Sequence, residues 1–410
     1  MSTPGFIGGR DHFHDFDLDS PEFRDHYDEV LGELLDKCPV AHSNAFGGYW
    51  MISRAEDVRR CAQDYETFTT VHGFEPNRSN EEGGLKLYPL EIDPPYHTRW
   101  RSALGPYFSP RAIRSREPNI RAQANYLIDT FIEKGSSEFV DEFAAQLPGR
   151  VFFGSFLGVP LSELNFIQKA TDTAMRGAAS ERAAAWGVVA GFLTDYLKSR
   201  EAEPPRGDFV DAVLAGVNTD DGEPCPWNHK LFIMIDMMAG GLGTTSHVLA
   251  TIAYYLATHP EDRERVIADP QLRPNLVEEV IRVYAPIVAV GRTATRDTEV
   301  AGQQIKEGDF VMLSQAAASR DPRLVTDPLT VNLDRAAPIN LAFSYGPHRC
   351  IGAHVGRLQA RVALEEILRR MPDFSLPDSY TPIYSNSSVA RNMDELKLVF
   401  TPGTRETTSQ

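Results

Sequence analysis

Apolar side chains recur three and four residues apart along most of the chain, and this spacing predicts a mainly helical protein. Residues 119–134 are the clearest case, because one face is apolar throughout and Gly135 follows as a C-terminal cap. The longest helical pattern covers residues 227–257 and would be roughly 45 Å long. Shorter segments predict a small β region, at 48–52, 293–295, 303–305 and 310–313.

Polar residues dominate the segment from residue 1 to about 30, which we expect to be an irregular, solvated tail. Ser53-Arg54-Ala55-Glu56 then has the form of a capping box, in which two side chains satisfy free backbone N–H groups. This motif predicts a short helix that continues through Cys61.

Composition is that of an ordinary globular protein, and it narrows the range of partners. The 410 residues are 42% hydrophobic and 24% charged, with a net charge of −16, which disfavours nucleic acid and anionic membranes. The four cysteines show neither metal-type spacing nor a paired framework, as is typical of a reducing cytoplasm. No signal peptide is evident, and the most apolar window, 231–242, contains Asp236 and is shorter than a membrane span. We therefore expect a soluble cytoplasmic protein.

A loop rich in glycine and proline delivers Cys350 to the start of a helix near the C-terminus. The positive end of that helix, together with Arg349 and His348, is expected to favour the thiolate over the thiol. A buried thiolate among small residues is what an iron porphyrin needs as an axial ligand. A lone cysteine in a turn would more often be structural, so the neighbouring motifs decide between the two interpretations.

Three glycines within four positions, Gly240, Gly241 and Gly243, interrupt the long central helix just before Thr244. Each glycine costs roughly 1 kcal/mol relative to alanine inside a helix. Such a weakness indicates room for a ligand against the backbone, a local opening of the hydrogen-bond ladder, or close packing of another helix.

Two other helical segments carry charged pairs that would share a helix face. His97 and Arg101 are four residues apart, and Glu279 and Arg282 are three apart. Either pair alone would more often be unrelated to a cofactor. The region from 97 to 121 is also locally basic, with only Glu117 offsetting its arginines, at Arg99, Arg101, Arg111, Arg114, Arg116 and Arg121.

Together these motifs resemble the cytochrome P450 family, whose cysteine loop has the pattern Phe-x-x-Gly-x-x-x-Cys-x-Gly. Phe343, Gly346, Cys350 and Gly352 match that pattern, and the other motifs follow in the family's order. The resemblance implies a mainly α fold with a small β region and a single domain over 1–410. Haem b would lie between the long central helix and the helix after the cysteine loop, with Cys350 as the iron ligand.

The resemblance also implies roles for individual residues. Thr244 would manage oxygen and protons, beside Gly243 and Gly240. Haem-binding positions would be His97, Arg101, Arg292 and His348 for the propionates, and Phe343, Gly346 and Gly352 in the loop. Glu279, Arg282 and Arg335 would form a structural network. Candidate pocket residues are Leu87, Ile235, Ala239, Ile287, Val288, Val290 and Val389.

One departure from the family bears on proton delivery. The residue before the threonine is usually Asp or Glu, and here it is Gly243. Our hypothesis is that waters admitted by Gly243 and held by Thr244 replace the acid, or that the substrate supplies a polar group. Asp236 lies eight residues earlier and about 80° around the helix, so any contribution from it would be indirect.

The implied activity is a haem-thiolate monooxygenase that uses O2 and acts on a small or medium hydrophobic molecule, such as a terpenoid, a steroid-like or an aromatic compound. Electrons would come from NAD(P)H through a ferredoxin reductase and a ferredoxin that docks on the basic region, and a monomer is expected. Gly243 keeps two alternatives open, namely peroxide-driven oxidation and a non-hydroxylating oxidation such as oxidative coupling. A haem-binding sensor or carrier without turnover is a third.

Overall fold

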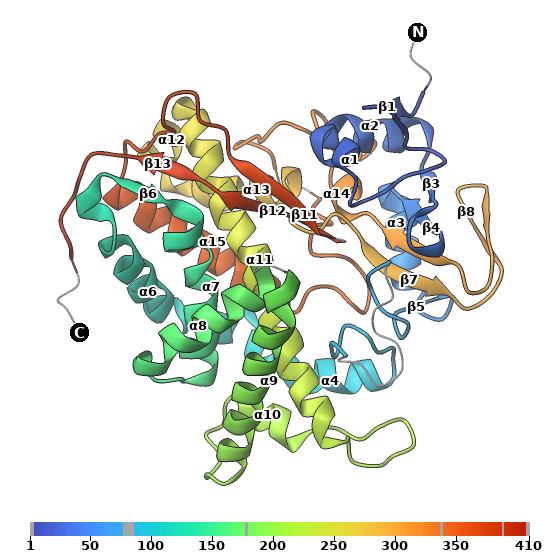
Figure 1. Ribbon diagram of the computed structural model, residues 1–410, viewed down its shortest axis with the longest axis horizontal. Coiled ribbons are helices and arrows are strands. Elements are labelled where there is room, and N and C mark those ends of the chain that lie inside the picture. The colour runs from blue at the N-terminus through green and yellow to red at the C-terminus, as the bar shows by residue number, and fades with distance from the viewer. Residues whose placement is uncertain (1–3, 77–85, 177–178, 337–338, 388, 407–410) are drawn as a thin grey trace.

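Helices make up most of the structure, a computed structural model that describes residues 4–76, 86–176, 179–336, 339–387 and 389–406 (Figure 1). This confirms the predicted mainly α fold with a small β region. The α-helices are α1 Pro21–Asp25, α2 Tyr27–Lys37, α3 Ala55–Gln63, α4 Tyr96–Leu104, α5 Pro110–Arg114, α6 Glu117–Asp129, α7 Gln146–Arg150, α8 Leu161–Arg176, α9 Ala179–Glu201, α10 Phe209–Ala215, α11 Trp227–Thr258, α12 Pro260–Ala268, α13 Arg273–Val283, α14 Gln315–Ala318 and α15 Ala353–Arg370.

Most of the β structure lies to one side of the helical part, while β6 and β13 lie among the helices on the other side (Figure 1). Its main sheet has five strands in the order β3-β4-β10-β7-β5, and β10 runs parallel to β4 while the other pairs are antiparallel. The other sheets each have two strands. The strands are β1 Phe6–Ile7, β2 Arg10–Asp11, β3 Val40–Ser43, β4 Tyr49–Ile52, β5 Phe68–Thr69, β6 Ser136–Glu138, β7 Val290–Ala294, β8 Thr298–Val300, β9 Gln303–Ile305, β10 Phe310–Leu313, β11 Ile383–Ser387, β12 Ala390–Glu395 and β13 Lys397–Val399.

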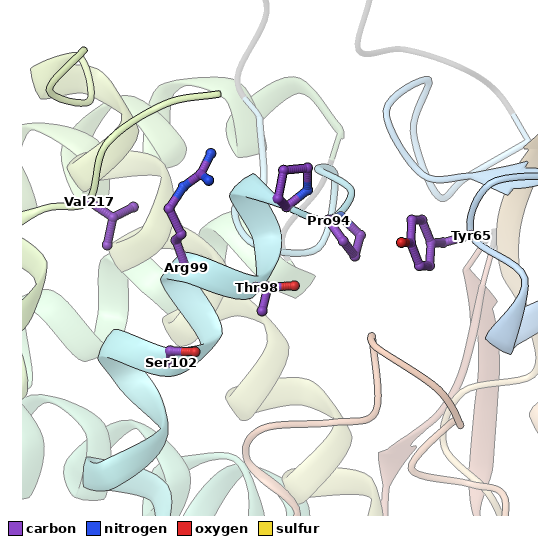
Figure 2. Close-up of a pocket in the computed structure, with 7 residues that line it drawn as sticks. Tyr65, Pro94, Thr98, Arg99, Ser102 and Val217 are labelled. Carbon is purple, nitrogen blue, oxygen red and sulfur yellow. The ribbon is translucent and has the colours of Figure 1, made fainter. Parts of the chain in front are cut away.

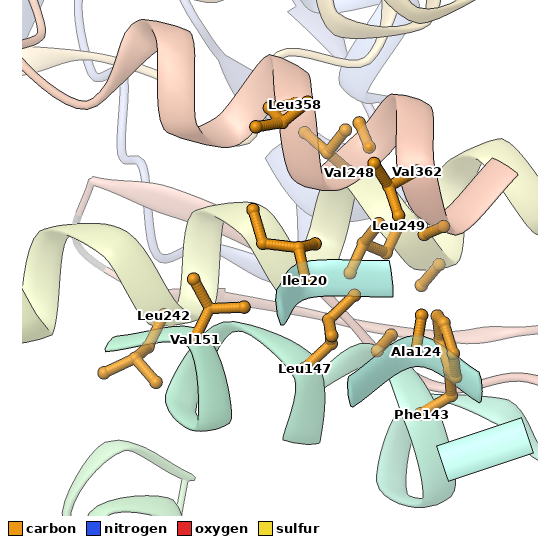
Figure 3. Close-up of a cluster of buried hydrophobic side chains, with 14 of the residues drawn as sticks. Ile120, Ala124, Phe143, Leu147, Val151, Leu242, Val248, Leu249, Leu358 and Val362 are labelled. Carbon is orange, nitrogen blue, oxygen red and sulfur yellow. The ribbon is translucent and has the colours of Figure 1, made fainter. Parts of the chain in front are cut away.

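The central helix α11 crosses the middle of the molecule and is surrounded by other helices (Figure 1). Every residue from Thr245 to Ala253 is buried, as expected for a helix with neighbours on all sides. Figure 3 shows Val248 and Leu249 of α11 meeting Leu358 and Val362 of α15, with α6 and α7 on the other side. No helix within the described ranges is long and apolar enough to cross a lipid bilayer.

The N-terminal segment is folded, so the prediction of an irregular, solvated tail is wrong. Phe16, Phe23 and Tyr27 are all buried. They belong to the same apolar cluster as Val288 and Phe310 from the second half of the chain. Because distant residues supply the covering surface, this burial leaves little trace in the local pattern.

The capping box predicted at the start of α3 does not form. Arg54 is the N-cap and makes no side-chain capping bond. The backbone N–H of Ala55 instead donates to the carboxylate of Asp321 at 3.0 Å. A side chain from a distant segment therefore satisfies the helix N-terminus.

Glu279, Arg282 and Arg335 form one ion-pair network, and the Glu279 and Arg282 side chains are fully buried. Glu279 Oε1 accepts from Arg282 Nε at 2.7 Å, and Glu279 Oε2 accepts from Arg335 Nε at 3.0 Å. Arg282 also donates to the carbonyl oxygens of Pro328 and Thr330, at 2.6 and 3.0 Å. The network therefore joins α13 to the segment that leads into the cysteine loop.

Glu279→Gln is expected to lower the free energy of unfolding by about 3–5 kcal/mol, because two guanidinium groups would lose their shared buried counter-charge. Urea unfolding of the haem-loaded protein, followed by circular dichroism, measures the change. Glu33→Gln is the control, since it breaks a surface pair with Lys37 and should cost about 0.3–0.5 kcal/mol. Equal effects of the two substitutions would contradict a structural role for the network.

Candidate functional site

The cysteine loop has a backbone shape that requires glycine at position 346. Gly346 has φ of +70°, and a Cβ at this position would overlap the carbonyl oxygen of Ala62 at the end of α3. The loop is also held from within, because Cys350 N–H donates to the carbonyl oxygen of Phe343 at 2.9 Å. A Cβ on Gly352 would lie 3.8 Å from the sulfur of Cys350. The glycines therefore fit the loop against α3 and keep the space beside the thiol clear.

Cys350 is an exposed residue, although protein atoms surround its thiol group. Burial raises the pKa of the thiol, while the Gly352 N–H, Arg101 and Arg357 act in the opposite direction. We expected the positive helix end, Arg349 and His348 to favour the thiolate, and the Gly352 N–H at the start of α15 does act in that direction. Burial is the largest effect, and the cations that help the thiolate come from α4 and α15.

Open space lies against α11 at the glycine-rich segment. A Cβ added to Gly240 or Gly241 would meet no other atom within 4 Å, and α11 remains helical throughout. These two glycines therefore leave room for a ligand. They do not break the hydrogen-bond ladder of α11, and, among the residues that the structure describes, no other helix packs closely against them. The charge of Asp236, one turn earlier on α11, acts to raise the pKa of Cys350.

Thr244 presents its hydroxyl to the same space. Its Oγ1 donates to the carbonyl oxygen of Gly240 at 2.9 Å and remains exposed. Because this bond uses the hydroxyl hydrogen, the free lone pairs of Oγ1 can only accept a hydrogen bond from a partner in the open space. Gly243 is partly exposed beside it.

The four predicted propionate-binding residues lie together. The rings of His97 and His348 are 4.2 Å apart, and both are also influenced by the charges of Arg101 and Arg292. His97 Nδ1 and His348 Nε2 are buried without a hydrogen-bond partner. Buried polar atoms without partners are rare in folded proteins and point to a group that binds there.

Burial lowers the pKa values of His97, His348 and Arg292, and neighbouring arginines add to this effect at the two histidines. The pKa of His97 is lowered to about 3 and that of His348 to about 4, mainly by burial. Burial also lowers the pKa of Arg292 to about 10, and its side chain donates to the carbonyl oxygen of Gly291 at 2.7 Å. Such N–H donors suit the two carboxylates of a haem, so the residues present fit that cofactor.

Asp93 belongs to this group, although we predicted no role for it. Its carboxylate accepts from the hydroxyl of Thr70 at 3.0 Å and lies 3.8 Å from His348 Nε2. Asp93 is thus an acid placed to orient His348, whose ring lies close to that of His97. Its partners are distant in the chain, so the sequence alone showed no sign of this role.

The candidate pocket residues come from four segments. Val288 N–H donates to the carbonyl oxygen of Val389 at 2.8 Å, which fixes the β11–β12 hairpin beside the segment before β7. Both side chains are buried, as is Ile235 on α11. Ile287, which bridges to Ala390, and Val290 are half-buried, as are Ala239 and Leu87.

Two acidic side chains are buried near this pocket. The backbone N–H of Leu90 donates to Asp236, and Glu91 lies close enough to affect its charge. Burial and Glu91 raise the pKa of Asp236 to about 8, so its carboxyl group carries a proton at neutral pH. We treated Asp236 only as an indirect contributor, and its burial beside a second acid could not be seen from helix periodicity.

Figure 2 shows a separate hollow of about 630 Å³ on another side of α4. Thr98, Arg99 and Ser102 line it together with Tyr65 and Val217. It contains none of the predicted site residues, so we do not assign it a part in the chemistry at Cys350.

Comparison with known proteins agrees with this geometry. The family described as Cytochrome P450 matches residues 154–398. Probable cytochrome P450 127A1 of Sinorhizobium fredii is 33% identical over 337 residues, which make up 82% of this chain and 80% of that protein. Cytochrome P450 130 of Mycobacterium tuberculosis is 30% identical, over 92% of this chain and 96% of its own length. The crystal structure of cytochrome P450 CYP101C1 superposes with a TM-score of 0.85 at 27% identity, covering 97% of this chain and all (100%) of that chain.

The family match, the two bacterial relatives and the shared fold all lead to the same cofactor, iron protoporphyrin IX held by a cysteine thiolate. This chain belongs to the cytochrome P450 family and is a haem-thiolate monooxygenase.

Proposed function

We propose that this protein inserts one oxygen atom from O2 into a small or medium hydrophobic substrate, by hydroxylation or epoxidation. The observation that carries the proposal is the open face of α11 at Gly240, Gly241 and Thr244, in a chain whose cysteine loop has the shape described above. Cys350 would hold the iron, and His97, His348, Arg101 and Arg292 would hold the propionates. The bound haem would supply the activation of O2, which thiolate ligation favours.

The chain's own residues would control substrate and protons. Val288, Val389 and Ile235 provide apolar wall, which suits a terpenoid, steroid-like or aromatic molecule. Thr244 can accept a hydrogen bond from a group in the open space, and water beside Gly243 would relay protons to that group. Asp236 adds a second proton-bearing group that faces the same region.

An optical titration of the haem-loaded ferric protein tests the substrate class. A hydrophobic ligand that expels water from the iron is expected to shift the Soret band toward the high-spin form. Terpenoids, steroids, aromatic acids and fatty acids form the panel, and Val389→Trp is expected to weaken the response by filling the pocket. A panel without any shift, in protein that still forms the thiolate-type carbonyl complex, would contradict a general hydrophobic pocket.

Thr244→Ala is expected to lower the product formed per NADH roughly tenfold or more, because the proton route would lose its hydrogen-bonding group. Substrate turnover with a surrogate ferredoxin and reductase measures this ratio. Thr245→Ala, at a buried neighbouring position, is the control and should leave the ratio nearly unchanged.

The opposite change, Gly243→Asp, restores the acid usual in the family and is expected to raise the ratio. Strong uncoupling in the native protein that Thr244→Ala leaves unaffected would refute the water relay. Efficient turnover with peroxide alone, by a native protein that ferredoxin cannot drive, would instead favour the peroxide-driven alternative.

Asp236→Asn is expected to raise the free energy of unfolding at pH 7–8 by roughly 2–4 kcal/mol. The unfolded chain releases this proton near pH 3.8, the ordinary pKa of an aspartate, whereas the folded protein holds it to about pH 8. Stability is therefore lost as pH rises between these values, and asparagine, which does not ionise, avoids the loss. The gain should vanish near pH 4.

Thermal unfolding of the haem-loaded protein across pH 4–8 measures the difference, and Asp195→Asn on the exposed side of α9 is the control. A gain that is independent of pH would mean that the carboxyl group is not protonated in the folded protein.

We also propose a ferredoxin-type electron donor, supplied by NAD(P)H, but fewer arginines support it than the sequence indicated. Arg99 pairs with Asp220, Arg121 pairs with glutamates of α6 and α15, and Arg116 donates to the carbonyl oxygen of Ser155. Arg111 and Arg114 are exposed, and neither has an acidic partner in the described part of the chain. These two are the cations best placed to attract an acidic donor.

A further inference from the structure

A small, partly enclosed cavity lies behind the β11–β12 hairpin, apart from the cysteine site. Seven residues from five segments line it: Tyr27 of α2, His247 of α11, Tyr284 and Ala285 after α13, Arg320 after α14, and Tyr384 and Arg391 of the hairpin. Its volume is about 10 Å³, room for one particle the size of a water molecule.

Four of these residues carry a buried polar atom without a hydrogen-bond partner: Tyr27 at its hydroxyl, Arg320 and Arg391 at Nε, and His247 at Nδ1. The two Nε atoms can only donate, and the hydroxyl still has its hydrogen to donate. Leaving a buried polar atom unpaired is costly, so several around one cavity indicate an occupant that accepts hydrogen bonds.

The charges around the cavity favour a negative occupant. Arg320 is buried and pairs with Asp28 at 2.5 Å, but the side chain of Asp28 is 62% exposed. Arg391 has no ion pair within the described residues, and its guanidinium lies 4.2 Å from the ring centre of Tyr27 and 4.5 Å from that of Tyr384. Among the side chains that the structure describes, the two positive charges of Arg320 and Arg391 are therefore balanced by a single carboxylate, that of Asp28, which is itself largely exposed to solvent.

The remaining lining groups add no negative charge. Burial raises the pKa of both Tyr27 and Tyr384, so their hydroxyls stay protonated. Burial and Arg391 lower the pKa of His247 to about 3, so its ring is neutral at pH 7. One tautomer of that ring donates from Nε2 to the carbonyl oxygen of Tyr284 at 3.2 Å, and the other accepts from the Thr251 hydroxyl at 3.3 Å. The second tautomer leaves the hydrogen on Nδ1, as a fourth donor.

We propose that a single monatomic anion, of the chloride class, binds in this cavity between Arg320, Arg391 and the hydroxyl of Tyr27. A water molecule could accept hydrogen bonds from at most two of the three groups that must donate, which are Arg320 Nε, Arg391 Nε and the Tyr27 hydroxyl. A halide could accept hydrogen bonds from all three, and its charge would offset the unpaired charge of Arg391. A polyatomic anion such as sulfate or phosphate exceeds the available volume.

Such an ion would join parts of the protein that shape the substrate pocket. Arg391 follows Val389 on the hairpin by two residues, and its backbone N–H donates to the carbonyl oxygen of Pro286 at 2.9 Å. His247 follows Thr244 on α11 by three residues. The anion would thus hold the hairpin, α11 and α2 in one arrangement.

Anomalous diffraction from crystals of the haem-loaded protein grown with sodium bromide tests the site directly. The expected result is one bromide peak within hydrogen-bonding distance of Arg320 Nε and Arg391 Nε. A cavity that holds only a water-like density, with no anomalous signal, would overturn the proposal. The result does not depend on turnover, so it is separate from the test of the proposed function.

Thermal unfolding in solution gives a second, independent measurement. At tenfold excess over its Kd, bromide or chloride is expected to raise the midpoint by roughly 1–2 °C over acetate at equal ionic strength. Arg391→Gln should abolish that difference, while Arg206→Gln, which removes the same charge at an exposed position, should retain it. The same halide effect in all three proteins would refute the site. Tyr27→Phe, which deletes one donor and should weaken the effect, replaces Arg391→Gln if that variant does not fold.

Discussion

The buried pairing of Glu279 with Arg282 and Arg335 is the constraint on which the region around the cysteine depends. Taking three charges out of water is costly, so the arrangement is stable only because nearly every hydrogen-bonding position is filled. Arg282 reaches the carbonyl oxygens of Pro328 and Thr330, and Asn332 N–H donates to Glu279 at 3.0 Å. The irregular segment before the cysteine loop is therefore tied down without a helix or strand. Because this segment is held in place, the cysteine loop that follows it has a fixed position, with Gly346 packed against Ala62.

The polar groups around His97 and His348 show a protein built for a charged cofactor. Two neutral histidines and two arginines surround a small volume in which Asp93 is the acid that contacts His348. Without an anion, burial and the two arginines both disfavour a positive charge on either histidine, so the pKa values of both histidines are lowered. Binding two carboxylates there would offset the positive charge of the arginines. Cofactor binding and stability of this region are thus linked.

Local sequence signals predicted the long elements and the motifs well. The central helix was expected over 227–257 and spans Trp227–Thr258, because its apolar pattern is long and Pro260 follows its end. The glycine at position 346 could be interpreted because only a residue without Cβ fits there. Features that depend on distant partners could not be predicted: the burial of Phe16, the contact of Asp93 with His348, and the capping of α3 by Asp321. The pairing of Arg99 and Arg121 with acids was missed for the same reason.

The folded N-terminal segment has a consequence for how this protein can be changed. Phe16, Phe23 and Tyr27 share an apolar cluster with Val288 and Val389, two residues proposed to line the substrate pocket. The first helices therefore form the outer support of the pocket wall, although they are far from Cys350 in the sequence. Chimeras that exchange this segment would need to exchange the C-terminal hairpin with it. Variation near the N-terminus is thus a route by which substrate preference can drift while every residue of the pocket stays the same.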